Sequence, residues 1–185
     1  MEKGAAIRII GIDTNSFFLA VSLIEDGKFS GSYLFPPDGP ARRYDQPKRD
    51  GSKNKVYENR SALERLDAMA DGFSTWLPRP TAVGAIDYAY IEAPPFVNNV
   101  KTFAELTAVV MVTREVLRLD GIGVSLANVS TWKKRTIGNA KADKSEIRAW
   151  ALAHIPDIPD TLTEDEMDAA VIAFGGAVAA GEVRS

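Results

Sequence analysis

The order in which extended and helical segments follow one another constrains the fold of this chain most. Residues 6–14 (AIRIIGIDT) are a short apolar run rich in β-branched residues, which is typical of a buried strand. Residues 17–35 (FFLAVSLIEDGKFSGSYLF) predict two further strands, because Asp26-Gly27 is a favoured two-residue hairpin turn. The chain therefore opens with three antiparallel strands.

Helices and strands alternate after residue 58. We expect helices over residues 59–77, 98–118, 130–136, 143–155 and 162–176, and strands ending at Glu92 and following Gly121. Capping-box patterns mark two of the helix starts, Asp143 with Glu146 and Thr163 with Glu166. This order predicts a single α/β domain over residues 1–185, with a mixed five-stranded sheet covered by helices on both faces.

Two basic segments stand out against a net charge of −3. Residues 42–60 hold seven Lys/Arg and three acids, and residues 128–148 hold six and two. The first segment lies in a stretch without periodicity, about 36–60, which we predict to be a mobile loop inserted into the domain. Basic segments on an acidic body are typical of a phosphate-binding surface, although solvated loop charge has the same appearance.

Composition excludes several kinds of site. The chain has no cysteine and a single histidine, His154, which excludes thiolate metal sites and disfavours multi-histidine metal sites and Ser-His-Asp hydrolases. We find neither a signal peptide nor an apolar run long enough to span a membrane. We therefore expect a soluble, cytoplasmic protein with no membrane partner.

Four acids stand where regular elements favour other residues. Asp13 and Glu92 end the first and fourth strands, and Asp165 and Asp168 open the last helix, three residues apart on one face. Each has a structural explanation alone, since Asp is common in turns and complements the helix N-terminus. The capping box explains Glu166, and we leave Glu164 and Glu166 out of the site.

A cluster of carboxylates needs a cation, because unpaired buried charges are costly. Neighbouring parallel strands would bring Asp13 and Glu92 to one edge of the sheet, where sites form in α/β folds. With so few nitrogen and sulfur ligands in the chain, we expect Mg²⁺ or Mn²⁺. Two such ions commonly serve phosphodiester hydrolysis.

Four segments resemble, in order, the motif blocks of the RuvC family of Holliday junction resolvases, which have the RNase H fold of the retroviral integrase superfamily. They are GIDTNSFFLAVSLIEDG, YIEAPPFVNN, WKKRTIGNAKADKSEI and DEMDAAVIA. The resemblance implies a magnesium-dependent endonuclease that cuts four-way DNA junctions. Its metal-binding tetrad would be Asp13, Glu92, Asp165 and Asp168, holding two ions.

The same resemblance assigns roles outside the tetrad. The catalytic lysines near the scissile phosphate would be Lys133 and Lys144, and the homodimer interface would be helix 98–118. Phe96 would be the aromatic residue that enters the junction. We expect nine further lysines and arginines of the two basic segments to contact DNA: Lys134, Arg135, Lys141, Arg42, Arg43, Lys48, Arg49, Lys53 and Lys55. Trp132 we assign to the core.

Two departures from the family pattern concern the site. Asn15 replaces the usual glycine two residues after the first acid, and we attribute this to the tolerance of Asn for left-handed backbone. Phe96 stands one position later than the family's aromatic residue. With the basic insertion, these departures favour a bacteriophage-type member, acting in a bacterial or phage-infected cell.

Two other functions fit parts of the sequence. One is an RNase H-fold nuclease that acts mainly on flaps or replication forks. The other is an actin-like ATP-binding module, since GIDTNS also resembles a first phosphate loop. That fold duplicates its domain, whereas 185 residues hold one copy.

Overall fold

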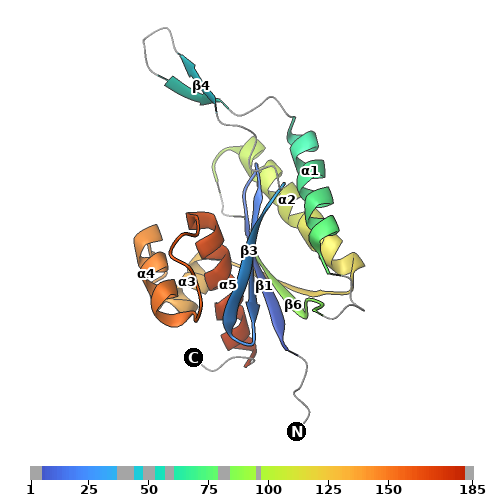
Figure 1. The fold of residues 1–185 in the computed structure, drawn as a ribbon. Coiled ribbons are helices and arrows are strands. Elements are labelled where there is room, and N and C mark those ends of the chain that lie inside the picture. Colours follow the sequence, from blue (N-terminus) through green and yellow to red (C-terminus); the bar gives the residue numbers. More distant parts are fainter. Residues whose placement is uncertain are drawn as a thin grey trace.

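A five-stranded sheet forms the centre of the fold (Figure 1). The computed structural model describes residues 6–36, 44–47, 53–56, 61–78, 84–94 and 97–181. In the order β3-β2-β1-β6-β7, the strands are β1 (Arg8–Thr14), β2 (Leu19–Glu25), β3 (Lys28–Phe35), β6 (Tyr88–Glu92) and β7 (Gly123–Ala127). The predicted mixed sheet of the α/β fold is confirmed.

The first three strands are antiparallel, and β6 and β7 add in parallel. The β2–β3 turn is the expected Asp26-Gly27 pair, with φ of 48° and 78°. Both values lie in the left-handed region that this tight turn requires, where Gly and Asp are tolerated. In the parallel pair of β1 with β6, Ile12 lies opposite Ile91, so the two strands end at the same edge of the sheet.

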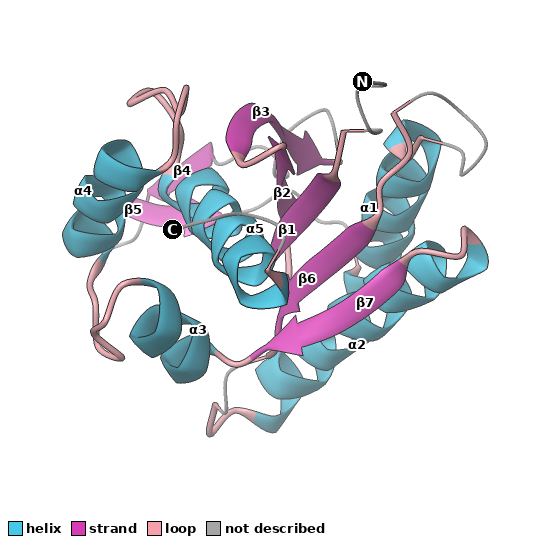
Figure 2. Ribbon diagram, turned by 90° about the horizontal axis from the view of Figure 1, so that it is seen from below, coloured by secondary structure: helices cyan, strands magenta, loops and turns pink. Residues whose placement is uncertain are grey.

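Helices cover both faces of the sheet (Figures 1 and 2). One face carries α1 (Ala62–Trp76) and α2 (Val100–Leu119), and the other carries α3 (Val129–Thr136), α4 (Lys144–His154) and α5 (Glu164–Ala180). Figure 2 shows α5 running beside β1, with α3 and α4 outside it. Both predicted capping boxes are present, at the start of α4 and of α5, and a third one caps α1.

Helix α5 packs against β1 at Gly11 more closely than any side chain would allow. A Cβ atom there would lie 2.0 Å from the carbonyl oxygen of Ala169 and 2.5 Å from the backbone nitrogen of Ala173. Ser22 on β2 strengthens the same contact, because its hydroxyl donates to the carbonyl oxygen of Glu166 at 2.8 Å. The first turns of α5 therefore lie against the part of the sheet that leads to Asp13.

Helix α2 has apolar residues on both its buried and its exposed sides. Val109, Val110 and Leu117 are buried against the sheet, whereas Val100, Phe103, Met111 and Leu119 are exposed. Neither α2 nor any other helix in the described ranges is long and apolar enough to cross a membrane.

The expectation of a loop without regular structure over 36–60 is wrong for two short stretches. Strands β4 (Tyr44–Pro47) and β5 (Lys53–Val56) pair antiparallel, with Tyr44 opposite Val56 and Pro47 opposite Lys53. They form a separate two-stranded sheet. No sequence pattern indicates it, because such a ribbon is held by backbone hydrogen bonds and needs no alternation of apolar residues toward a core.

Candidate functional site

The predicted acids come from three elements that meet at one edge of the sheet. Asp13 is the penultimate residue of β1, and Glu92 is the last residue of the neighbouring β6. The hydroxyl of Thr14 bridges the two strand ends, 3.5 Å from the carbonyl oxygen of Glu92. Asp165 and Asp168 belong to the first turns of α5, which the packing at Gly11 holds against β1.

The predicted acids act on one another electrostatically. Burial raises the pKa of Asp13 well above its ordinary value, and the charges of Glu92, Asp168 and Asp165 raise it further. Burial also raises the pKa of Glu92 and of Asp168, and each of these acids has a hydrogen bond that opposes the increase. Three of the four predicted acids therefore stand where the ionised form is disfavoured, which is common at functional sites.

Lys144 places an ammonium group among these carboxylates. Its Nζ donates to Oδ2 of Asp168 at 2.7 Å and lies 3.9 Å from Oδ1 of Asp165. Burial acts to lower the pKa of Lys144, but the hydrogen bond to Asp168 and the surrounding carboxylates raise it overall. Lys144 is thus a fixed positive charge within the acidic cluster.

Asp168 has an oxygen that the protein does not satisfy. The residue is 5% exposed, and its Oδ1 is buried with no hydrogen-bond partner among the described residues. An oxygen in this position, within a set of carboxylate donors, fits a hard divalent cation. Within the described ranges, however, no three acidic or histidine side chains already stand in a metal-binding arrangement. The acids are gathered, and Lys144 occupies part of the space between them.

Glu92 receives a hydrogen bond from a residue that sequence reasoning assigned only to the core. The indole Nε1 of Trp132 on α3 donates to Oε2 of Glu92 at 3.0 Å. Trp132 is indeed buried, at 6% exposure. Its place before the lysine run was visible in the sequence, but its acceptor lies 40 residues earlier and only the fold brings the two together.

Lys133, the second predicted catalytic lysine, lies next to Trp132. Its Nζ donates to the carbonyl oxygen of Ala142 at 2.9 Å and lies 5.6 Å from the centre of the indole ring. Its charge acts on Glu92 and Asp168, since it lowers the pKa of both carboxyls. Lys133 therefore borders the acidic cluster without contacting it.

The loop after Asp13 is held in a way that the sequence did not reveal. Asn15 accepts a hydrogen bond from the backbone N–H of Phe17 at 3.0 Å through its side chain, and its φ is not positive, since the non-glycine residues of the described ranges with positive φ are Asp26 and Asp157. Our attribution of Asn15 to left-handed backbone is therefore wrong. The side chain forms an Asx turn, which a glycine cannot make.

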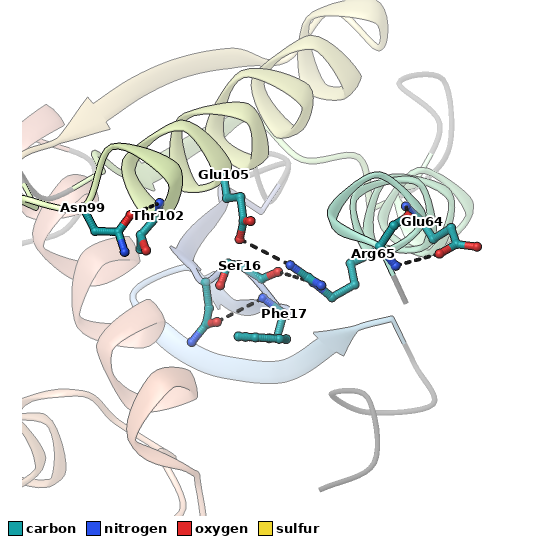
Figure 3. Close-up of polar contacts among 9 residues, drawn as sticks. Ser16, Phe17, Glu64, Arg65, Asn99, Thr102 and Glu105 are labelled. Carbon is teal, nitrogen blue, oxygen red and sulfur yellow. Dashed lines mark hydrogen bonds and ion pairs between the residues drawn. The ribbon is translucent and has the colours of Figure 1, made fainter. Parts of the chain in front are cut away.

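Arg65 on α1 joins this loop to α2 (Figure 3). Its Nε donates to the carbonyl oxygen of Ser16 at 3.0 Å, and its Nη2 pairs with Glu105 at 3.3 Å. The guanidinium also lies over the ring of Phe17, 4.6 Å from its centre. One side chain thus connects the segment after Asp13 to two helices. No local sequence pattern predicts this role.

The predicted DNA-contacting residues divide into three groups. Lys134, Arg135 and Lys141 are exposed on α3 and on the loop that follows it. Lys53 and Lys55 are on β5, where only the backbone is described. The others lie outside the described residues: Phe96, Arg42, Arg43, Lys48 and Arg49.

Comparisons with known proteins find the fold and no sequence relative. No protein-family model matches the chain, and no curated protein matches its sequence. RuvC of T. thermophilus in complex with a Holliday junction substrate superposes with a TM-score of 0.67 at 16% identity, and the match covers 94% of each chain. Another Thermus thermophilus RuvC structure gives a TM-score of 0.65 at 16% identity, covering 95% of this chain and 96% of that one. The likeness establishes a RuvC-like fold along nearly the whole chain.

Proposed function

We propose that this protein is a divalent-metal-dependent, structure-specific endonuclease that resolves Holliday junctions and other branched DNA by hydrolysing a phosphodiester bond. The observation that carries the proposal is the buried Oδ1 of Asp168, without a partner among the described residues, at a sheet edge shared with Asp13 and Glu92. The RuvC-like fold supports it, because the site lies at the end of the strands where ligands bind in α/β sheets.

Asp13, Glu92, Asp165 and Asp168 would hold two Mg²⁺ or Mn²⁺ ions. Two ions bound in this way supply an activated water and stabilise charge on the leaving oxygen. Burial of Asp168 would keep its carboxylate fixed and exclude competing water. The like-charge repulsion within the cluster favours cation binding, since an added positive charge relieves it.

The lysines would act on the phosphate. Lys144 contacts Asp168 in the protein alone, and DNA binding would give its ammonium a phosphate oxygen as a second partner. Lys133, held at the border of the cluster, would add positive charge on the same side. The DNA backbone would be bound by Lys134, Arg135 and Lys141, together with the lysines and arginines of residues 42–55. Phe96 would contact the junction itself.

Two copies of the chain would be needed to cut two strands of a junction. The exposed apolar side of α2, with Val100, Phe103, Met111 and Leu119, supports a homodimer through this helix. Met111→Asp should then give a monomer in gel filtration with light scattering, without loss of thermal stability. A wild-type protein that is monomeric at micromolar concentration would contradict this interface.

The narrower proposals rest on the sequence. The substitution at position 15 and the basic insertion favour a bacteriophage-type enzyme acting in the cytoplasm of the host cell.

Cleavage of synthetic DNA tests the proposal directly. With Mg²⁺, the protein should cut a four-way junction faster than a flap or a fork, and linear duplex least. Asp168→Asn should reduce cleavage to the level found with EDTA. Glu164→Gln is the matched control, because Glu164 is an exposed acid one turn before Asp168 in α5 that we leave out of the site.

Each other result has a definite meaning. Faster cleavage of flaps or forks would favour the alternative nuclease, and ATP binding without cleavage would favour the actin-like module. Full activity of Asp168→Asn would show that the site is assigned wrongly.

A further inference from the structure

The contact between Trp132 and Glu92 has an unusual combination of properties. An indole N–H can only donate a hydrogen bond, and here its acceptor is a carboxylate oxygen, Oε2 of Glu92, at 3.0 Å. Among the described residues, Trp132 is the one side chain that hydrogen-bonds this carboxylate. One oxygen of Glu92 is thus fixed by the protein, and the other remains for a ligand.

The donor itself is held rigidly. Trp132 belongs to the core cluster that also contains Ile147, Met167 and Ile172, and it is 6% exposed. Its backbone N–H donates to the carbonyl oxygen of Asn128 at 2.9 Å, in the first turn of α3. The indole cannot turn away without opening the core, so the position of Oε2 follows from the packing of α3.

We propose that Trp132 is a positioning residue for Glu92, whose indole N–H holds one carboxylate oxygen so that the other is directed to a divalent cation shared with the neighbouring acids. The inference rests on the proposed function and deepens it. Outer-shell hydrogen bonds of this kind orient metal ligands and reduce the freedom that is lost on binding. Because α3 also carries Lys133 to Arg135, one helix would set both a metal ligand and part of the DNA-binding surface.

Binding of Mn²⁺ alone, measured by titration calorimetry without DNA, tests this role. Trp132→Phe keeps an aromatic ring in the core but removes the donor, and we expect Mn²⁺ to bind about 10- to 100-fold more weakly. Trp150→Phe is the matched control. Trp150 is half-buried on α4 and stacks on His154 at 4.5 Å between ring centres, so its removal should leave Mn²⁺ affinity unchanged.

A spectroscopic measurement keeps the test decisive if Trp132→Phe folds poorly. The chain has three tryptophans, so the Trp76→Phe/Trp150→Phe protein emits from Trp132 alone. Its fluorescence should change saturably with Mg²⁺, and Asp168→Asn in the same background should abolish the change. A merely structural tryptophan would lower thermal stability on substitution without moving either readout.

The outcomes separate this inference from the function on which it rests. If the wild-type protein cleaves junctions but Trp132→Phe binds Mn²⁺ with wild-type affinity, the positioning role is wrong and the function stands. The same holds if emission from Trp132 is constant over the Mg²⁺ range that saturates cleavage. If the wild-type protein neither binds Mn²⁺ nor cleaves DNA, both proposals fail.

Discussion

Asp13→Asn should make the metal-free protein more stable. The Asp13 side chain is half-buried beside Glu92, Asp168 and Asp165, and desolvation is the largest cause of the raised pKa of its carboxyl. The charge of Lys144 opposes the increase. Asparagine has nearly the same shape as aspartate and no charge. The substitution therefore removes both the cost of desolvating a charge and the repulsion between like charges. No hydrogen bond of the Asp13 side chain within the described residues is lost.

The sign and size follow from linkage. An unfolded Asp titrates near pH 3.9. The pKa of Asp13 is higher in the folded protein, so the native state holds this proton more tightly than the unfolded state does. The free energy of unfolding therefore falls as the pH rises from the unfolded pKa to the folded pKa. Above both values, each unit of increase costs about 1.4 kcal/mol. We expect Asp13→Asn to add about 1–2 kcal/mol at pH 7, or about 2–8 °C in Tm for a chain of this size.

Urea unfolding in EDTA measures the effect. The added stability of Asp13→Asn should be present at pH 7. It should shrink toward pH 3, where the wild-type carboxyl is protonated in both the folded and the unfolded state. Added Mg²⁺ should reverse the order, because the wild type gains about 2.7 kcal/mol at 100 times its Kd whereas the variant binds the ion weakly. Asp67→Asn, on the exposed side of α1, is the control. It should change neither the free energy of unfolding in EDTA nor the stabilisation by Mg²⁺.

One result would refute the reasoning. If Asp13→Asn in EDTA is as stable as the wild type or less stable at pH 7, the acids do not repel one another in the folded protein. The electrostatic argument for a cation site would then lose its basis, whatever the effect of the substitution on cleavage.

Substitutions at three further positions test contacts around the site by urea unfolding in EDTA. Lys144→Met should cost about 1 kcal/mol, because it removes a 2.7 Å contact to Asp168 from a half-exposed ammonium. The loss should be smaller in an Asp168→Asn background, where Lys144 still faces Asp165 at 3.9 Å. Arg65→Ala should cost about 1–3 kcal/mol, because it removes the contacts to Ser16, Glu105 and Phe17. Arg65→Lys should cost somewhat less, since lysine keeps the charge but cannot make all three contacts. Equal losses for the two variants would contradict this. Gly11→Ala should cost about 3 kcal/mol or prevent folding, because its Cβ would lie 2.0 Å from the Ala169 carbonyl oxygen, and near-wild-type stability would refute that packing.

Local chemistry explains which features could be predicted from the sequence. The hairpin at Asp26-Gly27 and the capping boxes at the starts of α4 and α5 depend on residues within four positions of one another. The β4–β5 ribbon was missed because its pairing uses backbone groups, which every residue has. The Asx turn at Asn15 was mistaken for left-handed backbone, since Asn favours both conformations and its sequence neighbours do not distinguish them.

The sequence by itself determined which acids were candidates, because Asp13, Glu92 and Asp168 stand where a strand end or a helix face favours other residues. Tertiary structure decided what they contact. The parallel pairing of β1 with β6 brings Asp13 near Glu92, and the approach of α5 at Gly11 adds Asp168. Contacts between residues far apart in the chain, such as the hydrogen bond of Trp132 to Glu92, depend on the packing of whole elements, and the sequence of either partner does not specify them.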